Sequence, residues 1–407
     1  RVQVVERERN GHICAASNSA LSLAEGEFVA LLDHDDCLAP QALFRVAQAL
    51  NRHPDAGLLY SDEDKLNDDG VRFDPHFKPK WSPDLLLAQN YLSHLGVYLS
   101  ALVRELGGFR EGFEGSQDHD LALRVSARLA PEQIVHIPYV LYHWRAGDGS
   151  TALESGEKDY TTRAGLAAVR EHVQAQVSDV EVVEGHYPNT YRVRWPLPEQ
   201  QPLVSLLIPT RDRVEILKPC VDAILERTDY PRLEVLILDN QSTCAETLDY
   251  MRDVSNRDER VRVLRWDEPF NYSAINNYGA LHARGEIIGL INNDIEPIHS
   301  DWLEEMVRQA CRPEIGCVGA KLYYPDDTIQ HGGVILGIGG VAGHAHKYFH
   351  RNSPGYFTRL HLAHNLSAVT GACLLVRKSV YEHVGGLDET NLAISFNDVD
   401  LCLKVRE

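Results

Sequence analysis

Short apolar runs alternate with amphipathic stretches along the chain. Residues 203–209 and 234–238 have the length and burial pattern of strands, and residues 214–228 between them carry apolar side chains at helical spacing. Residues 287–291 form another strand-sized apolar run. Strands that alternate with helices predict an α/β fold with a mostly parallel sheet, whose ligands bind at the carboxyl ends of the strands.

The pattern occurs twice. Residues 18–35 align with residues 277–294 at a constant offset of 259, and each copy predicts a helix, a Gly-Glu turn, a buried strand and an acidic cluster. Further on, Gly107-Gly108-Phe109 and Asp118 match Gly385-Gly386-Leu387 and Asp398 at an offset of 278 to 280. The second copy therefore carries about 20 extra residues, which we place in the Gly- and His-rich stretch 332–346.

The repeat predicts two domains, residues 1–177 and residues 203–407. Between them, residues 178–202 are polar and end in a proline-rich stretch, a composition typical of an extended linker.

Composition narrows the functional classes. The chain has 40 basic and 59 acidic residues, a net charge of −19, which argues against a nucleic-acid partner. The eight cysteines are widely spaced and indicate reduced thiols in the cytoplasm. Since the longest apolar runs are only strand-sized, we expect no transmembrane segment and no signal peptide.

Carboxylates supply the candidate chemistry. Asp33-His34-Asp35-Asp36 puts three of them at the end of a predicted strand, where their repulsion favours a bound divalent cation. A solvated loop that caps the next helix is the structural alternative. Asp118 and Asp398 each begin a predicted helix, where a carboxylate is often only an N-cap. Their recurrence beside the Gly-Gly motif favours a general base that deprotonates an acceptor hydroxyl.

With these motifs the chain resembles the family 2 glycosyltransferases of the GT-A fold, in particular bacterial multidomain enzymes that make O-antigen and related surface polysaccharides. The resemblance implies two tandem GT-A domains, a UDP-, dTDP- or GDP-sugar as donor, and Mg²⁺ or Mn²⁺ as cofactor. The acceptor is expected to be a hydroxyl of a growing glycan or lipid-linked glycan, attacked with inversion at the anomeric carbon. A cytoplasmic location with peripheral association at the inner face of the membrane is also implied, although no basic amphipathic helix supports membrane binding.

The resemblance assigns a role to particular residues of each copy. In the first copy, the base is Asp118, and the residues expected to bind the sugar nucleotide or its cation are Asp33, Asp35, His143, Arg145 and Ser150, with Asp35 and His143 on the metal. In the second copy, the base is Asp398, and the residues expected on the nucleotide sugar are Pro209, Thr210, Asp239, Asn240, Asn292, Asn293 and Asp294, with Asp294 on the metal. The residues expected on the acceptor side are Thr370, Gly371, Ala372 and His331.

Two functional alternatives stay open. Asn292 replaces the first carboxylate of the DxD pattern, so the second copy is either active or a non-catalytic module that holds the glycan. A nucleotidyltransferase is disfavoured because no glycine-rich basic loop follows residues 203–209. Residues 337–343 have the wrong glycine spacing for a dinucleotide site and are predicted to form a mobile loop over the sugar site. Residues 62–65 are predicted to form a solvated turn, with a contact to the sugar as the second interpretation.

The alignment also predicts what each copy lacks. The opening strand of the first copy would precede residue 1, and the metal histidine of the second copy would lie near position 423, beyond Glu407. We therefore expect the 407-residue chain, produced alone, to transfer sugar poorly.

Overall fold

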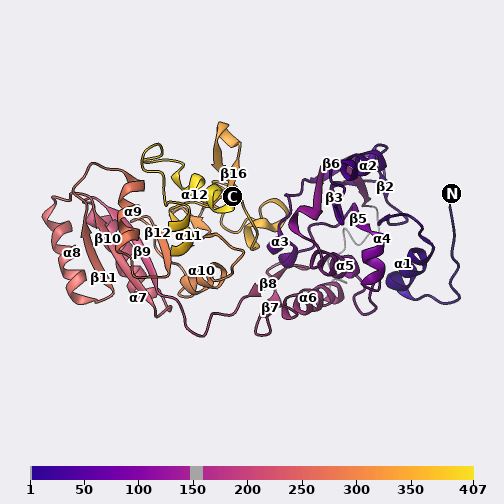
Figure 1. The fold of residues 1–407 in the computed structure, drawn as a ribbon, viewed down its shortest axis with the longest axis horizontal. Coiled ribbons are helices and arrows are strands. Elements are labelled where there is room, and N and C mark those ends of the chain that lie inside the picture. Colours follow the sequence, from indigo (N-terminus) through magenta and orange to yellow (C-terminus); the bar gives the residue numbers. More distant parts are fainter. Residues whose placement is uncertain (1, 147–158) are drawn as a thin grey trace. The chain divides into compact units, whose positions relative to one another are not determined.

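The computed structural model describes residues 2–146 and 159–407, which divide into two compact units. Unit 1 contains the chain up to residue 193 together with residues 354–365, and unit 2 contains residues 194–353 and 366–407. The elements of both units are labelled in Figure 1. Within the described ranges no helix is both long and apolar enough to cross a membrane.

Unit 1 is an α/β unit with a mixed sheet. Its elements in chain order are α1 (His12–Leu23), β1 (Phe28–Ala30), β2 (Cys37–Leu38), α2 (Ala42–Arg52), β3 (Leu58–Leu66), β4 (Arg72–His76), α3 (Pro83–Ala88), β5 (Gly96–Leu99), α4 (Ser100–Glu105), α5 (Gln117–Ser126), η1 (Pro131–Gln133), β6 (Ile134–Arg145), α6 (Asp159–Gln174), β7 (Glu181–Glu184), β8 (Tyr191–Arg194) and, in the later segment, η3 (Tyr356–His361).

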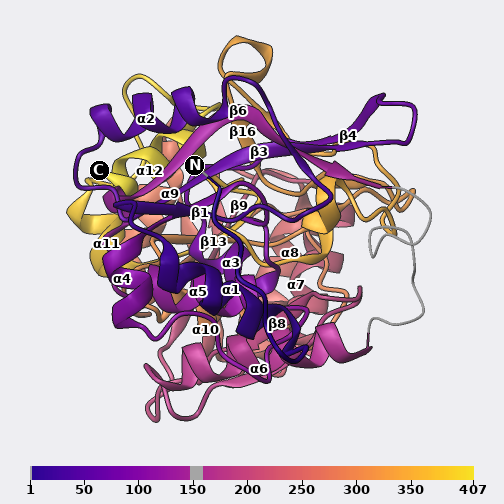
Figure 2. The ribbon, with the colours of Figure 1, turned by 90° about the vertical axis from the view of Figure 1, so that its right-hand side faces the viewer.

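The sheet of unit 1 has the order β1-β5-β3-β6-β2. Strand β4 pairs with the part of β3 that β5 does not contact. Strands β3 and β6 run parallel, and β5 is antiparallel to β3 and β1. Helix α2 packs against β6 (Figure 2). Its residues Ala42 and Val46 join a buried cluster with Leu59 and Leu141.

Unit 2 follows the alternation of strands and helices that the sequence predicts. Its elements are β9 (Val204–Thr210), α7 (Val214–Arg227), β10 (Leu233–Asp239), α8 (Ala245–Arg257), β11 (Val261–Arg265), α9 (Tyr272–His282), β12 (Ile287–Ile291), α10 (Trp302–Ala310), β13 (Cys317–Gly319), β14 (Leu322–Tyr323), β15 (Ile329–His331), β16 (Val334–Leu336), η2 (Ile338–Gly340), β17 (Ala342–His344), β18 (Cys373–Arg377), α11 (Lys378–His383) and α12 (Asn397–Arg406).

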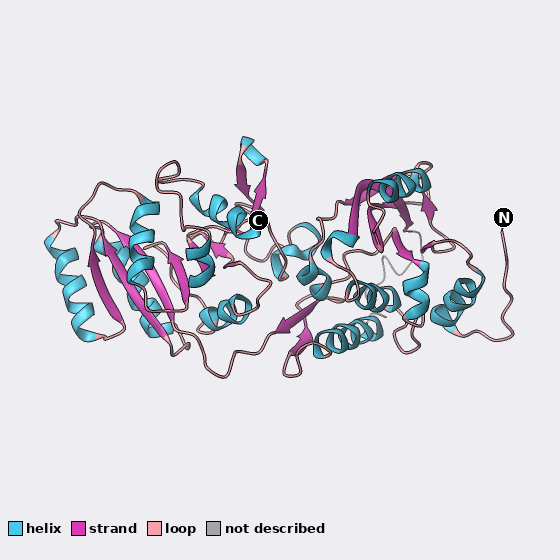
Figure 3. Ribbon diagram, viewed as in Figure 1, coloured by secondary structure: helices cyan, strands magenta, loops and turns pink. Residues whose placement is uncertain are grey.

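The main sheet of unit 2 has the order β11-β10-β9-β12-β18-β13 (Figure 3). The first four strands in this order are parallel, and β18 is antiparallel to its neighbours β12 and β13. The mixed α/β sheet expected from the sequence is therefore present. Because β9, β10 and β12 are parallel, their carboxyl ends meet at one edge of the sheet.

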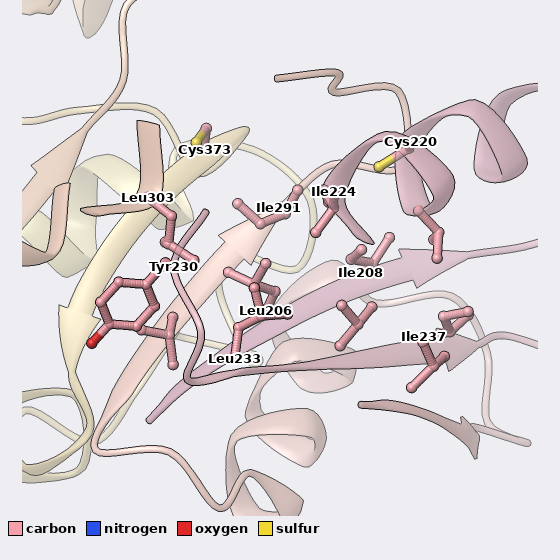
Figure 4. Packing of buried hydrophobic residues seen from close by; sticks show 14 of the residues in the cluster. Leu206, Ile208, Cys220, Ile224, Tyr230, Leu233, Ile237, Ile291, Leu303 and Cys373 are labelled. Atoms are coloured by element: carbon pink, nitrogen blue, oxygen red, sulfur yellow. The ribbon is translucent and has the colours of Figure 1, made fainter. Parts of the chain in front are cut away.

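Both faces of this sheet are covered. On one face, Leu206, Ile208 and Ile237 pack with Cys220 and Ile224 of α7 (Figure 4). Alternate residues of the same strands, such as Leu207, Leu236 and Leu290, enter a second cluster with side chains of α9, α11 and α12. Side chains alternate across a strand, so a strand covered on both faces is mostly apolar. The buried polar residues Ser205 and Glu234 near the starts of β9 and β10 are paired with each other, with Ser205 Oγ donating to Glu234 Oε1 (2.7 Å). The continuous apolar runs of the sequence follow from this arrangement.

One hydrogen-bond pattern occurs in both units at the positions that the repeat aligns. Asn18 of α1 donates from Nδ2 to Phe109 O (2.7 Å) and accepts at Oδ1 from Phe109 N (2.8 Å). Asn277 of α9 does the same with Leu387, at 2.9 and 3.0 Å. The glycine before each partner has a positive φ, 71° at Gly108 and 66° at Gly386, and a Cβ there would collide with the asparagine Oδ1. Each Gly-Gly motif thus lets the backbone close onto an amide clamp.

Two expectations need correction. The strand after the first Gly-Glu turn, β1, is half-buried at best, since it lies at the sheet edge and pairs with β5 alone among the described strands. The expected extended linker is partly folded, because β7 and β8 form a hairpin within it. A further feature had no sequence signal: residues 354–365 belong to unit 1, where Tyr356 Oη accepts from Phe77 N (2.7 Å).

The amide clamp predicts a stability effect. Replacing Asn277 by Ala removes its two bonds to Leu387 and the bond that Tyr381 Oη donates to Asn277 Oδ1 (2.6 Å). At about 1 kcal/mol for each hydrogen bond, we expect unit 2 to lose about 2 to 3 kcal/mol, measured as urea-dependent hydrogen exchange of the β9 and β12 amides. Asn256→Ala, at an exposed site on α8, is the matched control. An equal effect of both changes would refute a role for the clamp.

Candidate active site

Three ligand-type side chains converge in unit 1. Asp33 and Asp36 lie in the turn after β1, and His94 lies two residues before β5, the strand that pairs with β1. Ligand atoms of these three residues all lie within 4.8 Å of one another. In the described part of the chain this is the one group of three or more His, Cys, Asp or Glu side chains that meets this distance.

Neighbouring groups hold Asp36 in place. Tyr142 Oη donates to Asp36 Oδ2 (2.5 Å) and accepts from Asp33 N (3.2 Å). The backbone N of Arg145 donates to Asp36 Oδ1 (2.7 Å), and Arg145 Nε donates to Asp35 O (2.8 Å). The expected phosphate-binding arginine is thus fixed beside the acidic turn, while Ser150 lies outside the described residues.

The carboxylates of this turn repel one another. Desolvation raises the pKa of Asp33, His94 opposes this rise, and the carboxylates of Asp36, Asp118 and Asp35 add to it. A cation at the group would relieve that repulsion. Two carboxylate oxygens and one imidazole nitrogen suit Mn²⁺, and the carboxylates also suit Mg²⁺. The residues present therefore fit a divalent ion.

Two expected metal ligands are placed differently. The Asp35 side chain is 54% exposed and lies outside the three-residue group, with its nearest ion-pair partner His34 at 3.7 Å. His143, on β6, has Nδ1 at 2.5 Å from Asp64 Oδ1, so Asp64 already occupies that nitrogen. His94 was missed because the sequence around it forms no motif. Only the pairing of β5 with β1 brings it to the turn.

The predicted solvated turn at residues 62–65 is wrong. Asp62, Glu63 and Asp64 are buried within β3, and each has a histidine partner: His136 for Asp62 (2.8 Å), His76 for Glu63 (3.2 Å) and His143 for Asp64 (2.5 Å). Strand β3 runs parallel to β6, which carries two of these histidines, so pairing in the sheet makes burial of the acids tolerable.

Glu63 links this strand to the acidic turn. Burial alone would raise its pKa, but Lys78 and His76 outweigh burial and lower the pKa to about 2. The ionised Glu63 accepts from His94 N at Oε2 (3.0 Å). It thereby fixes the backbone that presents the His94 ring to Asp33 and Asp36, and the ring also stacks on Tyr142 with centroids 4.4 Å apart.

Asp118 is not the N-cap of its helix. Helix α5 has Ser116 at its N-cap position, and Asp118 lies inside the first turn. Its Oδ2 accepts from Asn90 Nδ2 (2.7 Å), and its charge contributes to the raised pKa of Asp33. The charge of Asp118 therefore acts on the acidic turn. Two residues later, Asp120 is buried between Arg110 and Arg124 and anchors the helix.

In unit 2 the ends of β9 and β10 come together as expected. Asn293 Nδ2 donates to Thr210 Oγ1 (3.1 Å), and Asn240 N donates to Thr210 O (2.8 Å). Asp239 is buried and already satisfied, since it accepts from Ser242 N (3.0 Å) and pairs with Arg265 (2.5 Å). Thr210, Asn240 and Asn293 thus form one polar edge of the sheet. Pro209 directly precedes this edge on β9.

Asn240 is the unusual member of this edge. It is 1% exposed, and its Nδ2 donates to Trp266 O and Glu268 O. Its Oδ1 is buried and has no hydrogen-bond partner among the described residues. A buried acceptor without a donor costs about 1 to 3 kcal/mol, so a ligand N–H or O–H at this position would be stabilised.

The expected acceptor-side turn meets the expected base. Asp398, in the first turn of α12, accepts from Gly371 N at Oδ2 (2.9 Å), and Tyr272 Oη donates to Gly371 O (3.2 Å). Ala372 continues the turn into β18, with Thr370 Oγ1 3.3 Å from Ala372 N. Across the sheet, Asn292 N donates to Ala372 O (3.0 Å), which joins this turn to the end of β12.

Asp294 and His331 lie apart from these contacts. Asp294 is exposed in the turn after β12. His331 is buried on β15, with its Nδ1 2.9 Å from His344 Nδ1. Burial and the neighbouring His344 lower the pKa of His331 to about 3, so this ring is neutral at physiological pH.

The three-residue group in unit 1 predicts which changes weaken cation binding. Asp36→Asn and His94→Gln each remove one ligand, so we expect Mn²⁺ affinity, measured by titration calorimetry, to fall about tenfold or more. Asp35→Asn, one residue away and outside the group, is the matched control and should change affinity less than about threefold. The assignment fails if Asp35→Asn abolishes binding while Asp36→Asn and His94→Gln bind normally.

Comparisons with known proteins identify the family of the chain. The model of the family described as Glycosyl transferase family 2 matches residues 1–97 and 205–385. The O-antigen biosynthesis protein RfbC of Myxococcus xanthus is 41% identical over 409 residues, which cover 100% of this chain and 31% of that protein. An uncharacterised protein of Sinorhizobium fredii, y4gI, is 52% identical over 407 residues, 100% of this chain and 45% of that protein. The chain thus spans less than half the length of these curated relatives.

Among solved structures, a mannosyltransferase from Pyrobaculum calidifontis, in complex with GDP-mannose and Mn²⁺, aligns with 52% of this chain and 55% of its own. Its TM-score is 0.39 and its sequence identity 19%. The family match covers more than half of the chain, in both units. The chain belongs to glycosyl transferase family 2.

Proposed function

We propose that the protein is a metal-dependent, inverting glycosyltransferase with two GT-A-type domains in tandem. It transfers sugar from a nucleotide-diphosphate donor to a hydroxyl of a growing bacterial surface glycan, at the cytoplasmic face of the membrane. The carrying observation is that each unit sets one carboxylate, Asp118 or Asp398, in the first turn of a helix beside polar strand ends. The 41% identity to an O-antigen biosynthesis protein supports a surface polysaccharide as product.

The donor side of the proposal uses different parts of the two units. In unit 2, the unsatisfied Oδ1 of Asn240 suits an N–H or O–H of a nucleoside, beside Thr210 and Asp239. In unit 1, Arg145 lies beside the acidic turn and suits the negative charge of a diphosphate. A divalent ion held by Asp33, Asp36 and His94 would neutralise charge on the departing diphosphate.

The base side follows from the position of the two carboxylates. In the proposed step, Asp118 or Asp398 takes the proton of an acceptor hydroxyl while that oxygen forms a bond to the anomeric carbon. The bond from that carbon to the diphosphate oxygen breaks, and its electron pair leaves with the nucleoside diphosphate. Asn90 orients Asp118 through Oδ2 (2.7 Å), and Gly371 N orients Asp398 through Oδ2 (2.9 Å). The other oxygen, Oδ1, takes the proton in each case, and in Asp398 this atom also accepts from Val399 N (2.9 Å).

A second candidate function is that unit 2 binds glycan without catalysis. Two observations favour it: Asn292 replaces a carboxylate, and the three-ligand group found in unit 1 has no equivalent among the described residues of unit 2. Both candidates keep unit 1 as a transferase.

Separate base substitutions distinguish the two candidates. Asp118→Asn and Asp398→Asn remove the proposed bases at nearly constant shape, so we expect each to lower formation of one linkage by about 10² to 10⁴-fold. The assay is transfer by the full-length protein from a panel of UDP-, dTDP- and GDP-sugars, with release of nucleoside diphosphate as a second readout.

Matched controls are Asp68→Asn and Asp253→Asn, which change exposed carboxylates of units 1 and 2. Normal transfer by Asp398→Asn would rule out catalysis by unit 2 and leave the glycan-binding role. Normal transfer by both base variants would refute the proposed function. Nucleotide binding should stay within about twofold in all four variants, because none of the changed residues is expected on the nucleotide.

A further inference from the structure

We propose that the hairpin β16–β17 of unit 2 binds membranes, and that its apolar tip inserts into the headgroup region of a bilayer that contains anionic lipid. The tip is defined as Ile335, Leu336, Ile338 and Val341. The proposal rests on the proposed function only in its choice of a bilayer as the apolar partner, since a lipid-linked acceptor would be found there. The hairpin itself is outside the proposed catalytic machinery.

The tip exposes more apolar surface than a solvated loop requires. Its four side chains are between 40 and 55% exposed, and they fall within seven consecutive residues that contain no charged or hydroxyl side chain. In Figures 1 and 3 the hairpin stands out from the other elements of unit 2. Scattered exposed apolar residues are normal, whereas a contiguous apolar projection marks an interaction surface.

The backbone of the tip is compact and suited to an apolar environment. Gly337 N donates to Val341 O (2.8 Å), which closes the turn, and β16 pairs with β17 from Val334–His344 to Leu336–Ala342. Gly337, Gly339 and Gly340 have positive φ, and a Cβ at any of them would meet nothing within 4 Å. Paired backbone groups lower the cost of leaving water. Because the glycines have no side chains, the four apolar side chains supply the side-chain surface of the turn.

The base of the hairpin is anchored in unit 2. Val334 is 5% exposed and packs in the core cluster of α9, α11 and α12, and it forms a β-bridge with Ala368. Ala345, which follows the returning strand, donates from its backbone N to Gly333 O (2.9 Å), just before β16. The tip is therefore held away from the core by an ordered stem, and its exposure is a property of the fold.

Charge identifies the kind of surface that fits. The whole chain carries 59 acidic and 40 basic residues and would be repelled by an anionic bilayer. Residues 328–381, which contain the hairpin, include no Asp or Glu. Lys347 follows the hairpin, and the neighbouring Tyr348 and Phe349 are 66 and 50% exposed. Aromatic and basic side chains beside an apolar element are typical of the bilayer interface.

The stem also connects the hairpin to the proposed base. His344 ends β17 and keeps an exposed surface. Partial desolvation and the charge of Lys347 lower the pKa of His344, and the nearby carboxylate of Asp398 opposes this change. A bilayer bound at the tip would thus hold the Asp398 region next to a lipid-linked acceptor. Residues 337–343, predicted to form a mobile loop over the sugar site, thus include the turn and part of the returning strand of this hairpin.

Vesicle binding tests the proposal without donor or acceptor. The protein is sedimented with vesicles of phosphatidylethanolamine and phosphatidylglycerol, and the partition coefficient is compared with that of Leu336→Ser/Ile338→Ser. We expect the double variant to lose binding about tenfold or more. The matched control is Leu281→Ser/Ile298→Ser, two residues of unit 2 that are 77 and 55% exposed. Binding of the hairpin variant at the wild-type level, or an equal loss in the control, would overturn the proposal.

Two further measurements distinguish insertion into a bilayer from contact between copies of the chain. The fluorescence of a tryptophan introduced as Ile338→Trp in the wild-type protein should shift to the blue on vesicles and be quenched by brominated lipid. Unshifted emission would count against insertion. If sedimentation velocity without lipid shows that the protein self-associates through the hairpin, the tip is a contact between copies and the proposal is wrong. If the full-length wild-type protein binds vesicles but releases no nucleoside diphosphate from any donor, the proposed function fails and the hairpin proposal stands.

Discussion

The structure of unit 2 depends on the complete burial of three parallel strands. Strands β9, β10 and β12 are covered on both faces, and residues such as Leu206, Leu207 and Ile237 have no exposed surface. Their backbone polar groups are satisfied within the sheet, and apart from the buried Ser205–Glu234 pair their polar side chains lie where the strands end. Thr210, Asn240 and Asn293 meet at that edge for this reason. The same constraint makes the unsatisfied Asn240 Oδ1 informative, because few buried polar atoms of the described residues are left without a partner.

Unit 1 shows two ways of placing carboxylates. The buried acids of β3 are each paired with a histidine, and Glu63 stays ionised through Lys78 and His76. In the acidic turn, by contrast, the carboxylates of Asp33 and Asp36 crowd one another with His94 as the imidazole beside them. In the first set each carboxylate has a histidine partner, and these pairs support the sheet. The second set lacks enough positive charge, which is the property of a cation site.

The sequence could predict features that depend on local pattern. The runs that became β9, α7 and β10 were located within a residue or two, and the aligned asparagines 18 and 277 make the same amide clamp. Features that depend on pairing between distant segments could not be predicted. His94 reaches the turn only through β5, the acids of β3 are tolerated only because β6 supplies histidines, and residues 354–365 join unit 1 through contacts such as that of Tyr356 with Phe77. An acidic stretch looks solvated until its partners are known.

The central claim is that the polar strand ends hold a nucleotide-diphosphate sugar. The most direct test is a crystal structure of the protein with Mn²⁺ and the nucleoside diphosphate that it binds most tightly. The account predicts a nucleoside within hydrogen-bond distance of Asn240 Oδ1 in unit 2, and anomalous scattering from Mn²⁺ between Asp33, Asp36 and His94 in unit 1. A nucleotide bound away from the carboxyl ends of the strands, with no manganese at that turn, would contradict it.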